Sequence, residues 1–148
     1  RWYRNTNITY SFANNKVTGS YGTATAREHA DTLWTQADSD NGDLPDEKSV
    51  GDLRAKGLKT VLIETLKKQA AQILQETDWY IIRKADAGTA VPSSITTHRA
   101  AVRTKAAEME TAITNASDTP ALETLYTYTE QEDGSVTRPI GNLPTLEV

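Results

Sequence analysis

The chain has 148 residues, of which 37% are hydrophobic and 24% are charged, with a net charge of −4 and no cysteine. This length fits one domain with a small appendage. The acidic balance excludes the basic surface needed for nucleic-acid binding, and the lack of cysteine excludes disulfides and thiolate metal sites. No apolar run approaches the roughly 18 residues of a transmembrane helix and no signal peptide opens the chain, so we expect no membrane contact.

The first 22 residues predict a β-hairpin. Apolar side chains alternate with threonine and serine in ITYSF (8–12) and VTGSY (17–21), with the period of two that is typical of strands. Asn14 and Asn15 lie between these runs, and asparagine tolerates the backbone angles of a tight turn. An isolated hairpin is marginal in water, so this one packs either on its own helices or on a neighbouring chain. The candidate contacts to such a partner are Tyr10, Phe12 and Tyr21.

Three helices are predicted in the middle of the chain. A short one covers 25–37, where apolar residues recur at helical spacing. The apolar stripe of the second is regular over 58–76, after a start weakened by two glycines. The third covers 93–116 and has a narrow seam with alanine-rich flanks, which lets a partner helix approach closely. We therefore predict a mainly α fold, an antiparallel helical hairpin of 58–76 against 93–116.

The end of the chain is predicted to hold one more short helix at 118–126, followed by an extended arm. Asp133-Gly134 reads as a turn between two short extended pieces, and the later prolines argue against a central strand. The arm residues expected to reach a partner are Pro139, Leu143 and Pro144. The predicted organisation is an N-terminal appendage of hairpin and short helix (1–45), a helical domain (46–128) and the C-terminal arm (129–148).

No pattern in the chain predicts chemistry. The acidic stretch DSDNGD (38–43) fails the register of a calcium loop, and no nucleotide-binding or nucleophile motif is present. Paired catalytic acids must converge in a cleft, and nothing in the positions of the helical carboxylates predicts that they do. We expect no catalytic residues, no metal site, no cofactor and no small-molecule substrate.

An irregular corner is predicted between the two long helices. Threonine and aspartate bond backbone groups where a helix breaks, and Trp79 and Tyr80 have large apolar bodies suited to closing the end of a helical pair. Because the helices are antiparallel, we predict an ion pair of Asp78 with Arg99 or Arg103. The residues expected to build the corner are Thr77, Asp78, Trp79, Tyr80, Pro92, Arg99 and Arg103.

The stretch LQETDWYIIRKADAGTAVPSSITTHRAAVR (74–103) carries a leucine, T-D-W, a proline and a spaced arginine pair. It resembles the short domain of phage tail assembly chaperones and tail-fibre-associated proteins, whose pattern is L-x-x-T-D-W, a corner, a proline and Y-R-x-x-L-R. His98 stands in place of the usual tyrosine, and IGNLPTLEV (140–148) is similar to a degraded W-P-x-x-P tail. The matching residues are Leu74, Thr77, Asp78, Trp79, Pro92, Arg99, Val102 and Arg103.

The resemblance covers about 66–116 and the tail, and it implies a phage protein without catalysis. Two roles follow from it. One is a virion component of the tail, fibre, baseplate or collar, an oligomer held to other tail proteins by protein contacts. The other is an assembly chaperone that stays in the host cytoplasm and is absent from the mature particle. The hairpin and the arm, both suited to reaching neighbours, favour the virion component.

Overall fold

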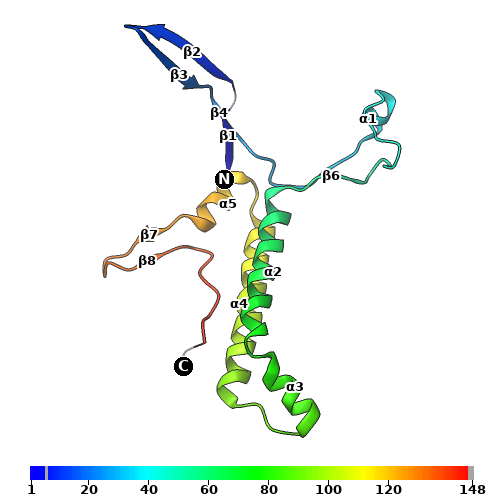
Figure 1. The fold of residues 1–148 in the computed structure, drawn as a ribbon, viewed down its shortest axis with the longest axis vertical. Helices are drawn as coiled ribbons and strands as arrows, with labels where there is room; N and C mark the ends of the chain where they lie inside the picture. The colour runs from blue at the N-terminus through cyan, green and yellow to red at the C-terminus, as the bar shows by residue number, and fades with distance from the viewer. Residues whose placement is uncertain (6, 147–148) are drawn as a thin grey trace.

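The computed structural model describes residues 1–5 and 7–146 (Figure 1). It is 44% helical and 19% strand, a mixed α/β fold in which helices predominate. The helices of the described residues are α1 (Gln36–Asp40), α2 (Leu58–Gln75), α3 (Asp78–Ala87), α4 (Ser93–Asn115) and α5 (Thr119–Tyr126). Their strands pair antiparallel as β1 (Tyr3–Asn5) with β4 (Ala24–Ala26), β2 (Ile8–Ala13) with β3 (Lys16–Tyr21), β5 (Thr32–Leu33) with β6 (Leu53–Ala55), and β7 (Thr129–Glu130) with β8 (Val136–Thr137).

The helices α2 and α4 lie antiparallel along the length of the molecule (Figure 1). Residues that recur every three or four positions share one face of a helix, and both helices bury such a face. On α2 these residues are Leu58, Leu62, Leu66 and Ala70. On α4 they are Ile95, His98, Arg99, Val102, Met109 and Ile113. The helical pair predicted at 58–76 and 93–116 is confirmed to within one residue at each helix end.

The main core lies at the end of this pair where α5 crosses it. There Leu122 and Ile140 join the buried residues of α2 and α4, and Trp2 packs against the cluster from the other end of the chain. The predicted helix at 118–126 is therefore α5, and its first turn is capped by the Asp118 side chain, which accepts from the Ala121 amide. Segments from both ends of the chain close the core of the helical pair.

The corner between the long helices is itself helical, which corrects the prediction of an irregular segment. Residues 78–87 form α3, and the break that separates it from α2 is confined to Glu76 and Thr77. No glycine or proline interrupts these ten residues, so the chain resumes helical geometry at once. The helix ends at Gly88, whose φ of 67° is a left-handed conformation that glycine adopts without strain.

The helix predicted at 25–37 is wrong. Residues 24–26 and 32–33 are strands, and only α1 at Gln36–Asp40 is helical, with a capping box between Thr35 and Asp38. The carbonyls of residues 28 and 29 are engaged elsewhere. They accept the amides of Leu58 and Lys59, the first of α2, at 3.0 Å each. The first backbone amides of a helix have no hydrogen-bond partner within that helix. The carbonyls of residues 28 and 29 supply such partners to α2, and they would be used internally if residues 25–37 formed a helix.

The C-terminal arm is partly a core element. Its turn at Asp133-Gly134 between β7 and β8 is confirmed, with Gly134 at a φ of 78°. Beyond Pro139, however, the chain returns to the helical pair. Ile140 is buried and its amide donates to the Leu125 carbonyl at 3.0 Å. Burial of the apolar Ile140 side chain in the core is more favourable in free energy than its exposure to solvent. The last two residues of the predicted arm, Glu147 and Val148, lie outside the described residues.

The molecule exposes more surface than its mass predicts. A compact folded monomer of 16.3 kDa has about 7,500 Å² of accessible surface, whereas this chain has 10,563 Å². The excess lies in the projecting elements, of which the β2–β3 hairpin, the α1 arm and the β7–β8 hairpin are visible in Figure 1. Among the described residues no helix combines the length and the apolar character needed to cross a lipid bilayer.

Candidate protein-interaction surfaces

The β2–β3 hairpin has one apolar face. Its register pairs Ile8 with Tyr21, Tyr10 with Gly19 and Phe12 with Val17. Residues two apart on a strand lie on the same side, so these three pairs share one face and the threonines and serines share the other. The turn residues Asn14 and Asn15 both have positive φ, as a two-residue hairpin turn requires. The predicted hairpin and its turn are confirmed.

Among the described residues, no other element covers the apolar face. All twelve strand residues are exposed, and Tyr10 and Phe12 keep 71% and 70% of their surface in solvent. Taking about 200 Å² for each aromatic side chain, the hairpin rings alone expose roughly 400 Å². Exposed apolar patches of this size are typical of interaction sites. Of the two alternatives left open by the sequence, packing on its own helices is wrong.

Within this face, Gly19 has a role that the sequence did not indicate. A Cβ added at Gly19 would lie 3.4 Å from the Tyr10 ring. The Tyr10 ring therefore lies over the glycine across the strand pair, where a larger side chain would lift it. The apolar face is consequently flat at its centre, with Phe12 and Tyr21 on either side of Tyr10. The candidate contacts Tyr10, Phe12 and Tyr21 thus occupy one continuous surface.

The three arm residues predicted as partner contacts are not gathered into this surface. Pro139 is exposed, but Leu143 and Pro144 are half-buried, and Leu143 packs against the main core. The hydrophobic side chain of Leu143 is therefore satisfied within the chain. The arm and the β2–β3 hairpin project from different places on the molecule (Figure 1).

The predicted corner forms around Arg99. Its guanidinium Nη1 donates to the Leu74 carbonyl and to the Thr77 hydroxyl, both at 2.7 Å, and lies 2.9 Å from Asp78 Oδ1. The ion pair predicted for Asp78 is confirmed with Arg99. Arg103 instead lines a shallow cavity beside Arg99. The Arg99 side chain is buried and thereby satisfies the last polar groups of α2 at the break.

Trp79 does not close the end of the helical pair as predicted. Half of its surface is exposed, and it lies against Tyr80, with ring centroids 4.3 Å apart, while the Arg83 guanidinium sits 4.5 Å from its ring. The two aromatic rings thus lie at the surface of α3, and the Arg83 cation lies over the Trp79 ring. Pro92 occupies the N-cap position of α4. The corner is held by the hydrogen bonds and the ion pair of Arg99, and not by packing of Trp79 against the end of the helical pair.

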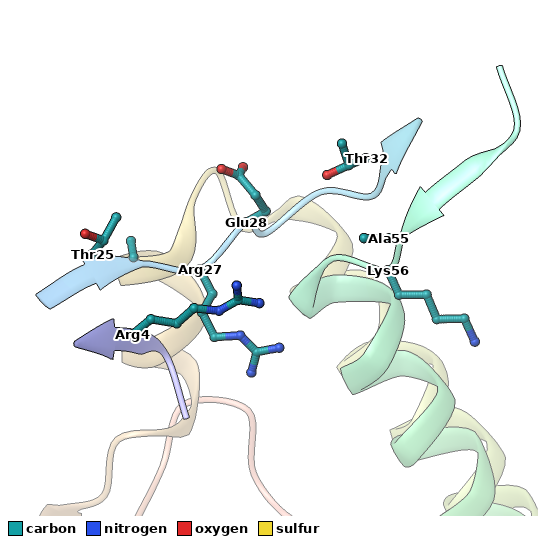
Figure 2. Close-up of a pocket in the computed structure, with 8 residues that line it drawn as sticks. Arg4, Thr25, Arg27, Glu28, Thr32, Ala55 and Lys56 are labelled. Atoms are coloured by element: carbon teal, nitrogen blue, oxygen red, sulfur yellow. The ribbon is translucent and has the colours of Figure 1, made fainter. Parts of the chain in front are cut away.

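A basic pocket that no sequence pattern predicts lies beside the β1–β4 pair. Figure 2 shows Arg4 from β1 and Arg27 from the end of β4 with their guanidinium groups side by side, and Lys56 on the opposite wall. The pocket has a volume of about 360 Å³. Its cations are 23 to 52 positions apart, so only the strand pairing and the start of α2 bring them together. Glu28 is the one carboxylate among its lining residues.

The backbone at Arg27 is fixed from two sides. Its amide donates to the Trp2 carbonyl at 2.9 Å, and its carbonyl accepts the Thr119 hydroxyl at 2.6 Å. Because Trp2 and the buried Thr119 belong to the packed end of the molecule, the pocket wall is anchored to the core. The arginine side chains are thereby held at a defined place on a rigid support, as recognition sites require.

The described residues hold no group of three or more histidine, cysteine, aspartate or glutamate side chains placed to bind a metal ion. In comparisons with known proteins, no family model, no curated protein and no solved structure matches this chain.

Proposed function

We propose that this chain is a non-catalytic structural subunit of a bacteriophage virion, in the tail, fibre, baseplate or collar region, that acts through protein contacts. The observation that carries the proposal is the exposed apolar face of the β2–β3 hairpin. Tyr10, Phe12 and Tyr21 are exposed to solvent on this face, so the free chain lacks the favourable free energy of burying them. A partner surface that covers it recovers this free energy, so the hairpin is suited to docking onto a neighbour.

The excess surface of the chain supports a role within an assembly. Subunits that fold alone bury most of their apolar groups, whereas subunits of large assemblies leave projecting elements to be covered by neighbours. The hairpin has a further property of a docking element, since Lys16 is its only charged residue. Low charge and aromatic side chains are typical of the centre of protein interfaces.

The phage assignment rests on the resemblance around residues 66–116. Four residues of the shared pattern, Leu74, Thr77, Asp78 and Arg99, meet in one hydrogen-bonded cluster. Residues that recur together in a pattern and also bond to one another form a structural unit. This supports the resemblance as one of structure, with the corner serving to position the surfaces beyond it.

An assembly chaperone, absent from the mature particle, is the second candidate. The observation that favours it is the set of exposed apolar residues distributed around α3, namely Trp79, Ile81 and Ile82. Chaperones hold clients through accessible apolar surfaces of this kind. In that role α3 is the client surface, and the hairpin is not needed in the particle.

Mass spectrometry of purified mature particles, with copy number per particle, separates the two roles. We expect this chain at a fixed stoichiometry that matches the symmetry of a tail component. If it is abundant in lysates of infected cells but missing from particles, the virion role is wrong and the chaperone role takes its place.

Removing the aromatic groups of the hairpin tests the docking surface. We expect Tyr10→Ser combined with Phe12→Ser to lower incorporation into particles about a hundredfold or more, because each aromatic side chain buried at a contact contributes about 1.5 to 3 kcal/mol. The melting temperature of the purified protein should stay the same, since these side chains contact only the partner strand of the exposed hairpin. Thr9→Ser with Thr18→Ser, on the polar face of the same strands, is the matched control. Unchanged incorporation of the first variant would exclude the hairpin as the contact.

A further inference from the structure

The basic pocket beside β1 and β4 has an unbalanced charge. The Arg4 guanidinium makes no hydrogen bond or ion pair with any described residue, and the Arg27 guanidinium donates only to the Arg1 carbonyl. Lys56 is already paired with Glu64, outside the pocket. Beside the two guanidinium groups the lining residues include a single carboxylate, Glu28, and in Figure 2 both Glu28 and Lys56 point away from these groups.

Two adjacent guanidinium groups form a specific receptor for carboxylates. Each presents a planar fork of N–H donors that matches the two oxygens of a carboxylate. Like charges side by side repel one another, so a chain that keeps Arg4 and Arg27 together without a partner gains stability when an anion binds between them. This excess of positive charge is also local, because the chain as a whole carries a net charge of −4.

A matching anionic element projects from the same chain. The β7–β8 hairpin carries Glu130, Glu132 and Asp133 at or beside its turn, and none of the three pairs with a cation among the described residues. Hydrogen bonds from the Ser135 hydroxyl and amide lower the pKa of Asp133, which therefore stays ionised. The tip points away from the body of the molecule and lies apart from the strands that form the pocket (Figure 1).

We propose that the pocket at Arg4 and Arg27 binds the acidic β7–β8 tip of a second copy of this chain. The contact is head-to-tail, because the pocket and the tip are different surfaces of one molecule. Each copy therefore offers one free pocket and one free tip, and repetition of the contact closes a ring or extends a filament. This contact goes beyond the proposed virion role and does not depend on it.

The size of the pocket favours the tip over the other acidic segment of the chain. A volume of about 360 Å³ accommodates a narrow turn, and the β7–β8 turn presents Glu132 and Asp133 in adjacent positions. The carboxylates of the α1 arm are spread over a broader loop, and Asp38 within it is already paired with Arg54 at 2.7 Å. That loop also continues into β6, which leads directly into the pocket wall at Ala55 and Lys56.

Charge reversal on each partner tests the contact in the purified full-length chain. We expect the wild-type protein to self-associate in sedimentation velocity at low salt, with an association that weakens as salt screens the charges. Arg4→Glu and Glu132→Arg should each weaken it about tenfold or more. The chain with both changes should associate again, since its pocket and its tip have exchanged charge. Circular dichroism confirms that each variant is folded.

Mixing the two single variants gives the sharpest result. The Arg4→Glu chain keeps its acidic tip and the Glu132→Arg chain keeps its basic pocket, while the reversed pocket of the first matches the reversed tip of the second. An equimolar mixture should therefore recover the association that each variant lacks alone, with the two variants alternating. Asp46→Arg with Glu47→Arg, on the α1 arm, is the matched control and should leave the association intact.

Three outcomes overturn the proposal: a wild-type chain that stays monomeric at all concentrations, an Arg4→Glu chain that associates normally, or a loss of association caused by the α1-arm variant and not by Glu132→Arg. The virion role is tested by particle composition, so the two proposals fail independently.

Discussion

Replacing Arg99 with leucine is expected to lower the free energy of unfolding by about 2 to 3 kcal/mol, because it removes a buried charged donor of two short hydrogen bonds. The Arg99 guanidinium is the shared partner of the Leu74 carbonyl, the Thr77 hydroxyl and the Asp78 carboxylate. Thr77 is almost completely buried, so no water replaces the lost donor at its hydroxyl oxygen, which keeps only its own donation to the Leu74 carbonyl at 3.0 Å. An unsatisfied buried polar group costs about 1 to 3 kcal/mol. Urea unfolding followed by circular dichroism measures the change.

Two milder changes separate this buried role from surface charge. The Asp78 side chain is half exposed, so Asp78→Asn should cost less than about 1 kcal/mol. Arg103→Leu, one turn further along α4, removes an exposed guanidinium and should have a similarly small effect. If Arg99→Leu were no more damaging than these two, the hydrogen bonds at the break would contribute nothing to holding α3 against the helical pair.

Replacing Gly57 with alanine is expected to destabilise the protein by about 2 to 3 kcal/mol, the usual cost of overpacking a rigid site. Gly57 is the N-cap of α2 and has a φ of −75°, which any residue adopts, so the change introduces no backbone strain, although glycine is preferred over alanine at an N-cap. The added methyl, however, would lie 2.2 Å from the carbonyl carbon and oxygen of Ala30. Backbone atoms are unable to rotate away as a side chain would, so the segment at 28–31 must move off the start of α2.

That movement would break the bonds that hold the two segments together. The Gly57 amide donates to Asp31 Oδ1 at 2.7 Å, and the next two amides donate to the carbonyls of residues 28 and 29. Gly51→Ala is the matched control, because its φ of 95° strains alanine while no atom lies near the added methyl. Thermal unfolding of both variants distinguishes steric contact from backbone strain. A Gly57→Ala chain that melts at or above the wild-type temperature would mean that the added methyl meets no steric obstacle at Ala30.

The sequence predicts the parts of this fold in which residues close in sequence determine the outcome. The 3.6-residue period of 58–76 and 93–116, the alternation over 8–21 and the Asn14-Asn15 turn each correspond to an element of the structure. The Asp78–Arg99 ion pair also follows from local reasoning, since an antiparallel pair of helices brings these positions together.

Other parts depend on contacts between distant residues and were missed. Residues 25–37 have helical spacing, but the carbonyls of residues 28 and 29 accept hydrogen bonds from the first amides of α2, about thirty positions later. Gly57 reads as a weak point of a helix, and only the position of Ala30 makes it necessary. The basic pocket joins three cations from separate segments, each of which reads as an ordinary surface residue on its own. These contacts join residues that are far apart in the sequence, so no short stretch of sequence predicts them.

The closure of the core by distant segments determines the order in which the chain folds. The α2–α4 pair requires only residues 58–115, which come together through a short connection and form early. Trp2, which lies 5.6 Å from Tyr126 between ring centroids, and Ile140 belong to the same packed end. During synthesis the helical pair therefore emerges with that end uncovered, and the N-terminal strands gain their support only after α5 and Ile140 have been made. The segment from α5 to Ile140 is thus made after the N-terminal strands that it supports.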